Sequence, residues 1–347
     1  MSAIGAVIVA AWILLQPACP AHAAGTGPTA YEAPAARSPL RLEGGALTGL
    51  PAELEPYATA HYVIAADDDR LWATFTGDLL ERFRLRFMQA FREGGFEVGD
   101  QGEPLVWLGF HDGQDYREHA HRSDRLDVSA MSAYYSCRTN QVAILLTDAG
   151  SEPAPQPAQV VQASVGHADV APPPSSRTGG VEVERIRHEA AHQLAYSLGL
   201  MKRGVMYPFW LAEGLATSFE TCGEDTTLLT ADNPVRRADL LCALQNGRLA
   251  PLEEFVVMAH LPSGDRQTAV DVYGQSWGFW QFLLRTRPAP LRRYMRSLAH
   301  LPMGRRRPQQ LRGEFIEAFG PIQRVEADWQ RYLQDLSATL ADGSDGP

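Results

Sequence analysis

The hydrophobic pattern changes at a proline-rich stretch, and this change constrains the fold more than any other feature of the chain. Before residue 150, apolar residues occur in short runs typical of strands, around one long amphipathic segment. From Val181 onward they recur every three or four residues, which indicates helices. Residues 150–180 contain six prolines among Gln, Ser, Ala and Gly, which predicts a disordered insertion. We therefore predict an α+β fold, in which a small α/β unit precedes a mainly helical region.

The α/β unit is predicted from residues 46–149. A strand is expected at residues 61–65, an amphipathic helix at 71–91 and a buried strand at 105–110. Residues 133–137 and 141–146 then form a predicted hairpin around Arg138-Thr139-Asn140. This order predicts a mixed sheet with an edge strand. The helical region is predicted to span residues 181–342.

The N-terminus predicts export. Residues 3–18 are an apolar run too short to span a bilayer comfortably, and Ala21-His22-Ala23 follows as a small-x-small cleavage pattern. We predict a signal peptide at 1–23, a flexible arm rich in Ala, Pro and Gly at 24–45, and a secreted or periplasmic protein. An uncleaved anchor, or a lipoprotein attached at Cys19, is the alternative. No later segment is long and apolar enough to span a membrane.

Net charge limits the possible partners of the chain, and cysteine content limits its possible disulfides. The 347-residue chain has a net charge of −10, which argues against a nucleic-acid partner. Cleavage after Ala23 would leave Cys137, Cys222 and Cys242. A disulfide between Cys222 and Cys242 and a set of three buried free thiols both remain open.

A metal-binding motif lies in the first helix after the insertion. The sequence His188-Glu189-Ala190-Ala191-His192 places two imidazoles one helical turn apart, so that both can bind a single Zn²⁺. Glu189 lies to one side of this pair, where it can reach a metal-bound water without being a ligand. It would act as a general base and then pass the proton on.

A catalytic zinc site needs a third protein ligand. The metzincin pattern is excluded, since Ala195 and Leu198 stand where it requires Gly and His. A second helix is predicted over residues 210–220, and Glu213 lies on its apolar side between small neighbours, which would let two helices approach closely. A buried carboxylate is costly unless it is paired or ligated. Three acidic residues further on are alternative ligands: Glu220, Glu224 and Asp225.

The two motifs together, His-Glu-x-x-His and Trp210-Leu-Ala-Glu-Gly-Leu-Ala216, resemble those of the gluzincin zinc metallopeptidases. Thr217 makes the second helix more similar to the aminopeptidase N-like branch than to thermolysin. The order of elements across residues 60–335 also resembles secreted bacterial proteins of unassigned function. The resemblance implies a zincin catalytic region that binds one zinc ion through His188, His192 and Glu213, with Glu189 as the base.

The resemblance extends to two further elements. Tyr273, in Val272-Tyr-Gly-Gln-Ser-Trp277, matches the tyrosine that hydrogen-bonds the oxyanion in these enzymes, although packing beside Trp277 and Trp280 explains it equally well. Ser132–Ser136 is the candidate edge strand for pairing with a peptide or protein substrate. The Gly-x-Met-Glu-Asn segment that anchors a free amino terminus in aminopeptidases is absent, so that specificity is not implied.

These observations predict a secreted zinc metallopeptidase. A zinc-bearing peptide-binding or envelope scaffold protein without turnover, and a structural module that binds no metal, are the alternatives. Two other clusters are expected to be solvated surface. One is a predicted loop that carries His111, His119 and His121 with Asp112 and Asp115, for which a second metal site is the alternative. The other is a group of arginines, for which an anionic lipid or acidic partner is the alternative: Arg292, Arg293, Arg296 and Arg305–Arg307.

Overall fold

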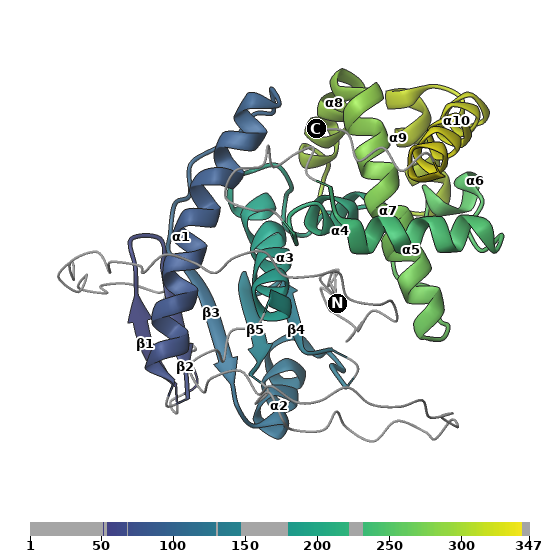
Figure 1. Ribbon diagram of the computed structural model, residues 1–347. Helices are drawn as coiled ribbons and strands as arrows, with labels where there is room; N and C mark the ends of the chain where they lie inside the picture. Colours follow the sequence, from purple (N-terminus) through teal and green to yellow (C-terminus); the bar gives the residue numbers. More distant parts are fainter. Residues whose placement is uncertain are drawn as a thin grey trace, which may run out of the picture.

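The structure, a computed structural model, describes residues 51, 54–67, 69–129, 131–146, 180–221 and 232–341 (Figure 1). The predicted signal peptide and arm, and residues 150–179 of the predicted insertion, lie outside these ranges. Within the described residues, no helix has the length and apolar character needed to cross a membrane.

The N-terminal part is a mixed five-stranded sheet. Its strands are β1 (Glu55–Ala58), β2 (Tyr62–Ala66), β3 (Leu105–Phe110), β4 (Ala133–Ser136) and β5 (Gln141–Leu145). They lie in the order β1-β2-β3-β5-β4. The three central strands β2, β3 and β5 run parallel, and β1 and β4 run antiparallel to their neighbours at the two edges. The mixed sheet followed by a helical region confirms the predicted α+β fold.

Alternating side chains of the central strands build two separate cores. Tyr62 and Ile64 face the core shared with α1 (Arg70–Glu93) and α3 (Gly180–Ser197). Val63 and Ala65 face the opposite core, where they pack with α2 (Gly113–Asp124). This follows from the two-residue period of a strand. Because both faces are covered, β2 and β3 are buried along their full length, as the continuous apolar runs of the sequence suggest.

Two elements of this part were not expected. Strand β1 has the sequence Glu-Pro-Tyr-Ala, is half exposed and carries no apolar alternation. Helix α2 replaces the solvated loop predicted around His119, so that prediction is wrong. The Asp112 side chain caps its first turn, and Tyr116 and Ala120 pack into the second core. The mostly polar sequence of α2 hides this narrow buried stripe.

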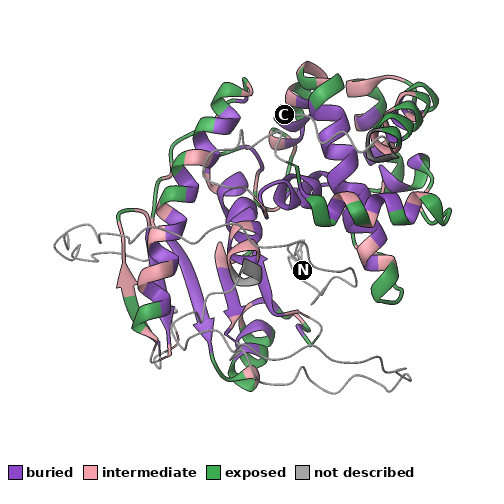
Figure 2. Ribbon diagram, viewed as in Figure 1, coloured by how far each residue is buried: buried purple, intermediate pink, exposed green. Residues whose placement is uncertain are grey.

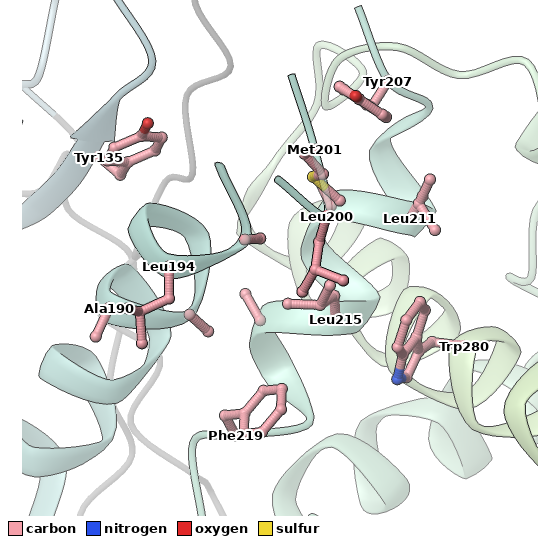
Figure 3. Close-up of a cluster of buried hydrophobic side chains, with 14 of the residues drawn as sticks. Tyr135, Ala190, Leu194, Leu200, Met201, Tyr207, Leu211, Leu215, Phe219 and Trp280 are labelled. Atoms are coloured by element: carbon pink, nitrogen blue, oxygen red, sulfur yellow. The ribbon is translucent and has the colours of Figure 1, made fainter. Parts of the chain in front are cut away.

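The C-terminal part consists of helices: α4 (Phe209–Thr217), α5 (Pro234–Gln245), α6 (Leu252–Phe255), α7 (Arg266–Thr286), α8 (Pro288–Ala299), α9 (Pro308–Phe319) and α10 (Ile322–Ala341). Helix α7 packs against both α4 and α5, while α3 joins the sheet to α4 (Figure 1). Buried residues concentrate on α3, α4 and α7 (Figure 2). Leu194, Leu215 and Phe219 lie in the core that connects α3 with α4 (Figure 3).

Candidate metal centre

Helix α3 presents the two histidines of the motif from one face. Their side chains are buried, at 0% and 1% exposure, and the Nε2 atoms of His188 and His192 lie 3.2 Å apart. The helix is fixed against the sheet one position further on. There the Gln193 amide accepts a hydrogen bond from the Trp107 indole at 2.7 Å and donates one to the backbone carbonyl of Asn140 at 2.9 Å. The histidines are thus held on a helix that cannot rotate freely.

Helix α4 brings Glu213 to the same point. One oxygen of its carboxylate lies 3.3 Å from Nε2 of His188 and 3.5 Å from Nε2 of His192. The neighbouring Gly214 permits close packing, although against α7 rather than α3. A Cβ atom added there would lie 2.7 Å from Cβ of Trp280 and would also clash with the Ser276 carbonyl. Glycine at 214 therefore allows α4 to pack closely against α7, and this packing fixes the position of Glu213.

The three ligand atoms form a nearly equilateral triangle with sides of 3.2, 3.3 and 3.5 Å. Zinc binds histidine nitrogen and carboxylate oxygen at about 2.0–2.2 Å, which for a tetrahedral ion places neighbouring ligand atoms about 3.3 Å apart. His188, His192 and Glu213 are also the one such group within the described residues. The donor types and their spacing thus fit a metal ion with three protein ligands. This confirms a possible metal site at the predicted residues.

The ionisation of these groups reflects the same proximity. Burial disfavours charge on His188, but the hydrogen bonds that its ring donates to the carboxylates of Glu213 and Glu220 outweigh this effect and raise its pKa to about 10. Burial lowers the pKa of His192. For Glu213, burial is outweighed by the two histidines, which lower its pKa to about 2. A cation entering the site must therefore displace the proton held by His188.

Glu189 lies beside the ligands without being one of them. Its carboxylate is fully buried, and neither oxygen has a hydrogen-bond partner of good geometry within the described residues. Burial raises its pKa to about 8, while charged His188 and the Tyr135 backbone amide of β4 act in the opposite direction. A buried carboxyl group next to a metal site, facing a strand edge, is suited to accept and return a proton.

Glu220 has a different role from the one considered in the sequence. Helix α4 ends at Thr217, and the turn that follows carries Glu220 behind His188, where its carboxylate lies 2.9 Å from Nδ1. It also accepts hydrogen bonds from Asn233 and, in a bidentate pair, from Arg236. Burial opposes its charge, but Arg236 and His188 outweigh it and lower the pKa to about 2. Glu220 therefore orients a ligand; Glu224 and Asp225 lie outside the described residues.

Tyr273 reaches the site from α7. Its buried ring lies 6.4 Å from the His188 ring and 5.5 Å from Phe209, and the Arg236 guanidinium lies 5.3 Å from its centre. The structure thus brings all five predicted site residues, from three helices, into one cluster. Asn233 and Arg236, which complete the surroundings of Glu220, were missed. Polar side chains at the start of a helical segment give no sign of this role until α5 is placed beside the turn that follows α4.

Strand β4 forms the sheet edge above α3, as the sequence predicts for Ser132–Ser136. The Ser132 carbonyl accepts a hydrogen bond from the Leu145 backbone at 2.7 Å, so alternate residues of β4 pair with β5. The backbone groups of Ala133 and Tyr135 therefore point away from β5. Within the described residues, β4 has no second neighbouring strand.

The remaining histidine and cysteine candidates that the structure describes are not part of this metal site. His111, His119 and His121 form no metal-binding group within the described residues. Cys137 is buried and Cys242 exposed, and the predicted pairing with Cys222 lies outside the described residues.

Comparison with protein families gives a match in the region of the site. A family model described as "Protein of unknown function (DUF1570)" matches residues 182–303, which include all five site residues. The match covers less than half of the chain and leaves out the sheet. No curated protein matches the sequence.

Proposed function

We propose that this protein is a zinc-dependent metallopeptidase of the gluzincin type. The observation that carries the proposal is the triangle of His188, His192 and Glu213, whose ligand spacing suits a tetrahedral ion, with Glu189 adjacent. The resemblance of the two helical motifs to gluzincins supports peptide-bond hydrolysis as the reaction. All five residues are buried, so the chemistry would take place away from bulk solvent.

In this proposal each residue has one task. His188, His192 and Glu213 hold the ion. When bound, zinc supplies Lewis-acid polarisation of the scissile carbonyl and lowers the pKa of a bound water towards ~7. Glu189, beside the ligands but not one of them, would accept a proton from the attacking water and deliver it to the leaving amine. Tyr273 donates a hydrogen bond to the carbonyl oxygen as that atom gains negative charge.

Strand β4 would bind the substrate. The outward backbone groups of Ala133 and the outward carbonyl of Tyr135 can pair with an extended peptide, which would add a strand to the sheet beside Glu189, whose carboxylate faces the Tyr135 amide. Such main-chain pairing positions the scissile bond without specifying side chains. We further propose that the protein acts outside the cytoplasm, secreted or periplasmic, as the predicted signal peptide implies.

Cleavage of a mixed peptide library by the zinc-loaded protein tests this function. The Glu189→Gln variant is the comparison, since it keeps the side-chain shape and all three ligands. We expect cuts with the wild type and none with the variant, at equal zinc content. If neither protein cuts although both bind zinc and peptides, the proposal fails in favour of a peptide-binding protein without turnover.

A further inference from the structure

A long segment of the chain is cationic although the whole is acidic. Residues 272–313 contain nine arginines and no Asp or Glu, in a chain with a net charge of −10. Several of these arginines have carboxylate partners, among them Arg296 with Glu97, Arg306 with Glu314 and Arg312 with Glu253. The positive charge that this segment offers to an external partner therefore comes from the cations that have no carboxylate partner.

Two loops from distant parts of the sequence lie side by side at this segment. Residues 200–207 lie in the connection between α3 and α4, and residues 300–307 connect α8 to α9. An isolated bridge joins Val205 to Gly304, the Gly304 amide donates to the Gly204 carbonyl at 2.8 Å, and the Lys202 ammonium donates to the Leu301 carbonyl at 3.2 Å. The connection between the two ligand-bearing helices is thus held against the arginine-rich loop.

Of the five Lys and Arg residues in the paired loops, Arg306 is paired with Glu314, which leaves four: Lys202, Arg203, Arg305 and Arg307. The three arginines are exposed and Lys202 is half-buried. No carboxylate of the described residues lies within ion-pair distance of any of them. Exposed guanidinium groups that lack internal partners are available to an external anionic one. We call these four residues with Met303 the basic loop pair.

Met303 is an exposed apolar residue in the second of these loops. Its side chain is 72% exposed, one of the few large apolar side chains that the fold leaves in solvent, and it rests over Gly204. A bulkier residue at 204 would meet Met303, and the positive φ of 84° there also favours glycine. An exposed apolar side chain in the same loop as exposed arginines suits a membrane surface, which offers anionic headgroups and an apolar interior beneath them.

We propose that the basic loop pair docks the protein on an anionic lipid membrane. The arginines would contact headgroup phosphates while Met303 inserts between them. Because the rest of the molecule is acidic, an anionic surface would attract this face and repel others, which fixes the orientation. The exposed Met303 side chain favours lipid over an acidic protein as the occupant. The inference does not depend on the proposed peptidase activity.

Vesicle flotation with the full chain tests the docking. Vesicles of phosphatidylcholine with and without phosphatidylglycerol are compared, at low and high salt. The test variant is Arg203→Glu/Arg305→Glu/Arg307→Glu. The matched control, Arg82→Glu/Arg117→Glu/Arg122→Glu, changes net charge equally at exposed positions on α1 and α2. Each basic residue near such a surface contributes about fivefold to partitioning, so losing three should weaken binding by at least ~100-fold.

We expect the test variant to lose binding to anionic vesicles, the control to keep most of it, and Met303→Ser to weaken it to a smaller extent. High salt should reduce wild-type binding. Equal losses in both triple variants would overturn the proposal, because net charge alone would then explain binding. Equal binding to both kinds of vesicle would also overturn it. Poly-L-glutamate serves as a third arm: if only its binding depends on these arginines, the partner is an acidic protein.

Discussion

The Glu220 carboxylate lies 2.9 Å from Nδ1 of His188, on the opposite side of the ring from Glu213, whose carboxylate lies 3.3 Å from Nε2. A hydrogen bond from Nδ1–H to Glu220 leaves the Nε2 lone pair directed at the metal position. The carboxylate also fixes the ring orientation and makes the imidazole a stronger ligand. Arg236, fully buried and bidentate to Glu220, holds that carboxylate in turn.

Glu220→Gln should weaken zinc binding by about 10–100-fold, because the amide is a poorer partner for Nδ1–H. It should also lower the melting temperature of the metal-free protein, since among the described residues Arg236 would keep Asp239 alone, at 3.6 Å, as an ionic partner. Chelator competition and thermal unfolding measure the two effects. Glu184→Gln, one turn before His188 and half-buried, is the control. Equal loss of zinc affinity in both variants would contradict an orienting role.

Gly214→Ala should destabilise the protein and weaken metal binding together. The added methyl would clash with the Ser276 carbonyl and push α4, which carries Glu213, away from α7. Overpacking of this kind typically costs about 1–3 kcal/mol. Gly313→Ala is the matched control, because a Cβ there meets nothing within 4 Å, and it should be neutral or stabilising. Denaturant unfolding of both variants, with and without zinc, would reveal the difference; a stable Gly214→Ala that binds zinc normally would count against this packing argument.

Tyr273→Phe should lower kcat by ~100-fold and leave zinc affinity unchanged, if the phenol stabilises the oxyanion. KM should change little, since the interaction strengthens only in the transition state. Tyr294→Phe is the comparison, because Tyr294 is equally buried but stacks on Trp210 instead of lining the site. Unchanged kcat in Tyr273→Phe would show that this residue only packs between Phe209 and Arg236.

His119 should make stability depend on pH. Burial against Phe110, whose ring lies 5.3 Å away, lowers the pKa of His119 below 6.5, while Asp124 opposes this. The folded state therefore binds fewer protons than the unfolded chain as the pH falls below about 6.5, so the free energy of unfolding should fall there. His119→Gln should flatten this part of the profile, measured by urea unfolding between about pH 5 and 8. An unaltered slope in the variant would assign the effect to other groups.

The sequence predicts the sheet well where burial on both faces produces continuous apolar runs, as in β3. It fails for β1, whose four residues carry no alternation, and for α2, whose buried stripe consists of a few positions among charged ones. These elements depend on packing against the sheet, which no local pattern records.

The candidate metal site is largely predictable because its ligands follow a helical spacing and a motif. His188 and His192 are fixed by one turn of helix, and Glu213 by its place among small and apolar neighbours. The residues that orient the ligands are not predictable in the same way. Glu220 was considered as a ligand, yet α4 ends three residues earlier, so its carboxylate lies behind His188. Asn233 and Arg236 join it only through the packing of α5.

Zinc stoichiometry, combined with thermal unfolding, tests the central claim most directly. Purified wild-type protein should bind one zinc ion per chain, and removing it with a chelator should lower the melting temperature. At zinc concentrations 1,000 times the dissociation constant, the stabilisation should be about 4 kcal/mol. His192→Ala should bind at least 100-fold more weakly and show no comparable shift. A wild-type protein that binds no zinc, or a His192→Ala variant that binds it as tightly, would contradict a metal centre formed by His188, His192 and Glu213.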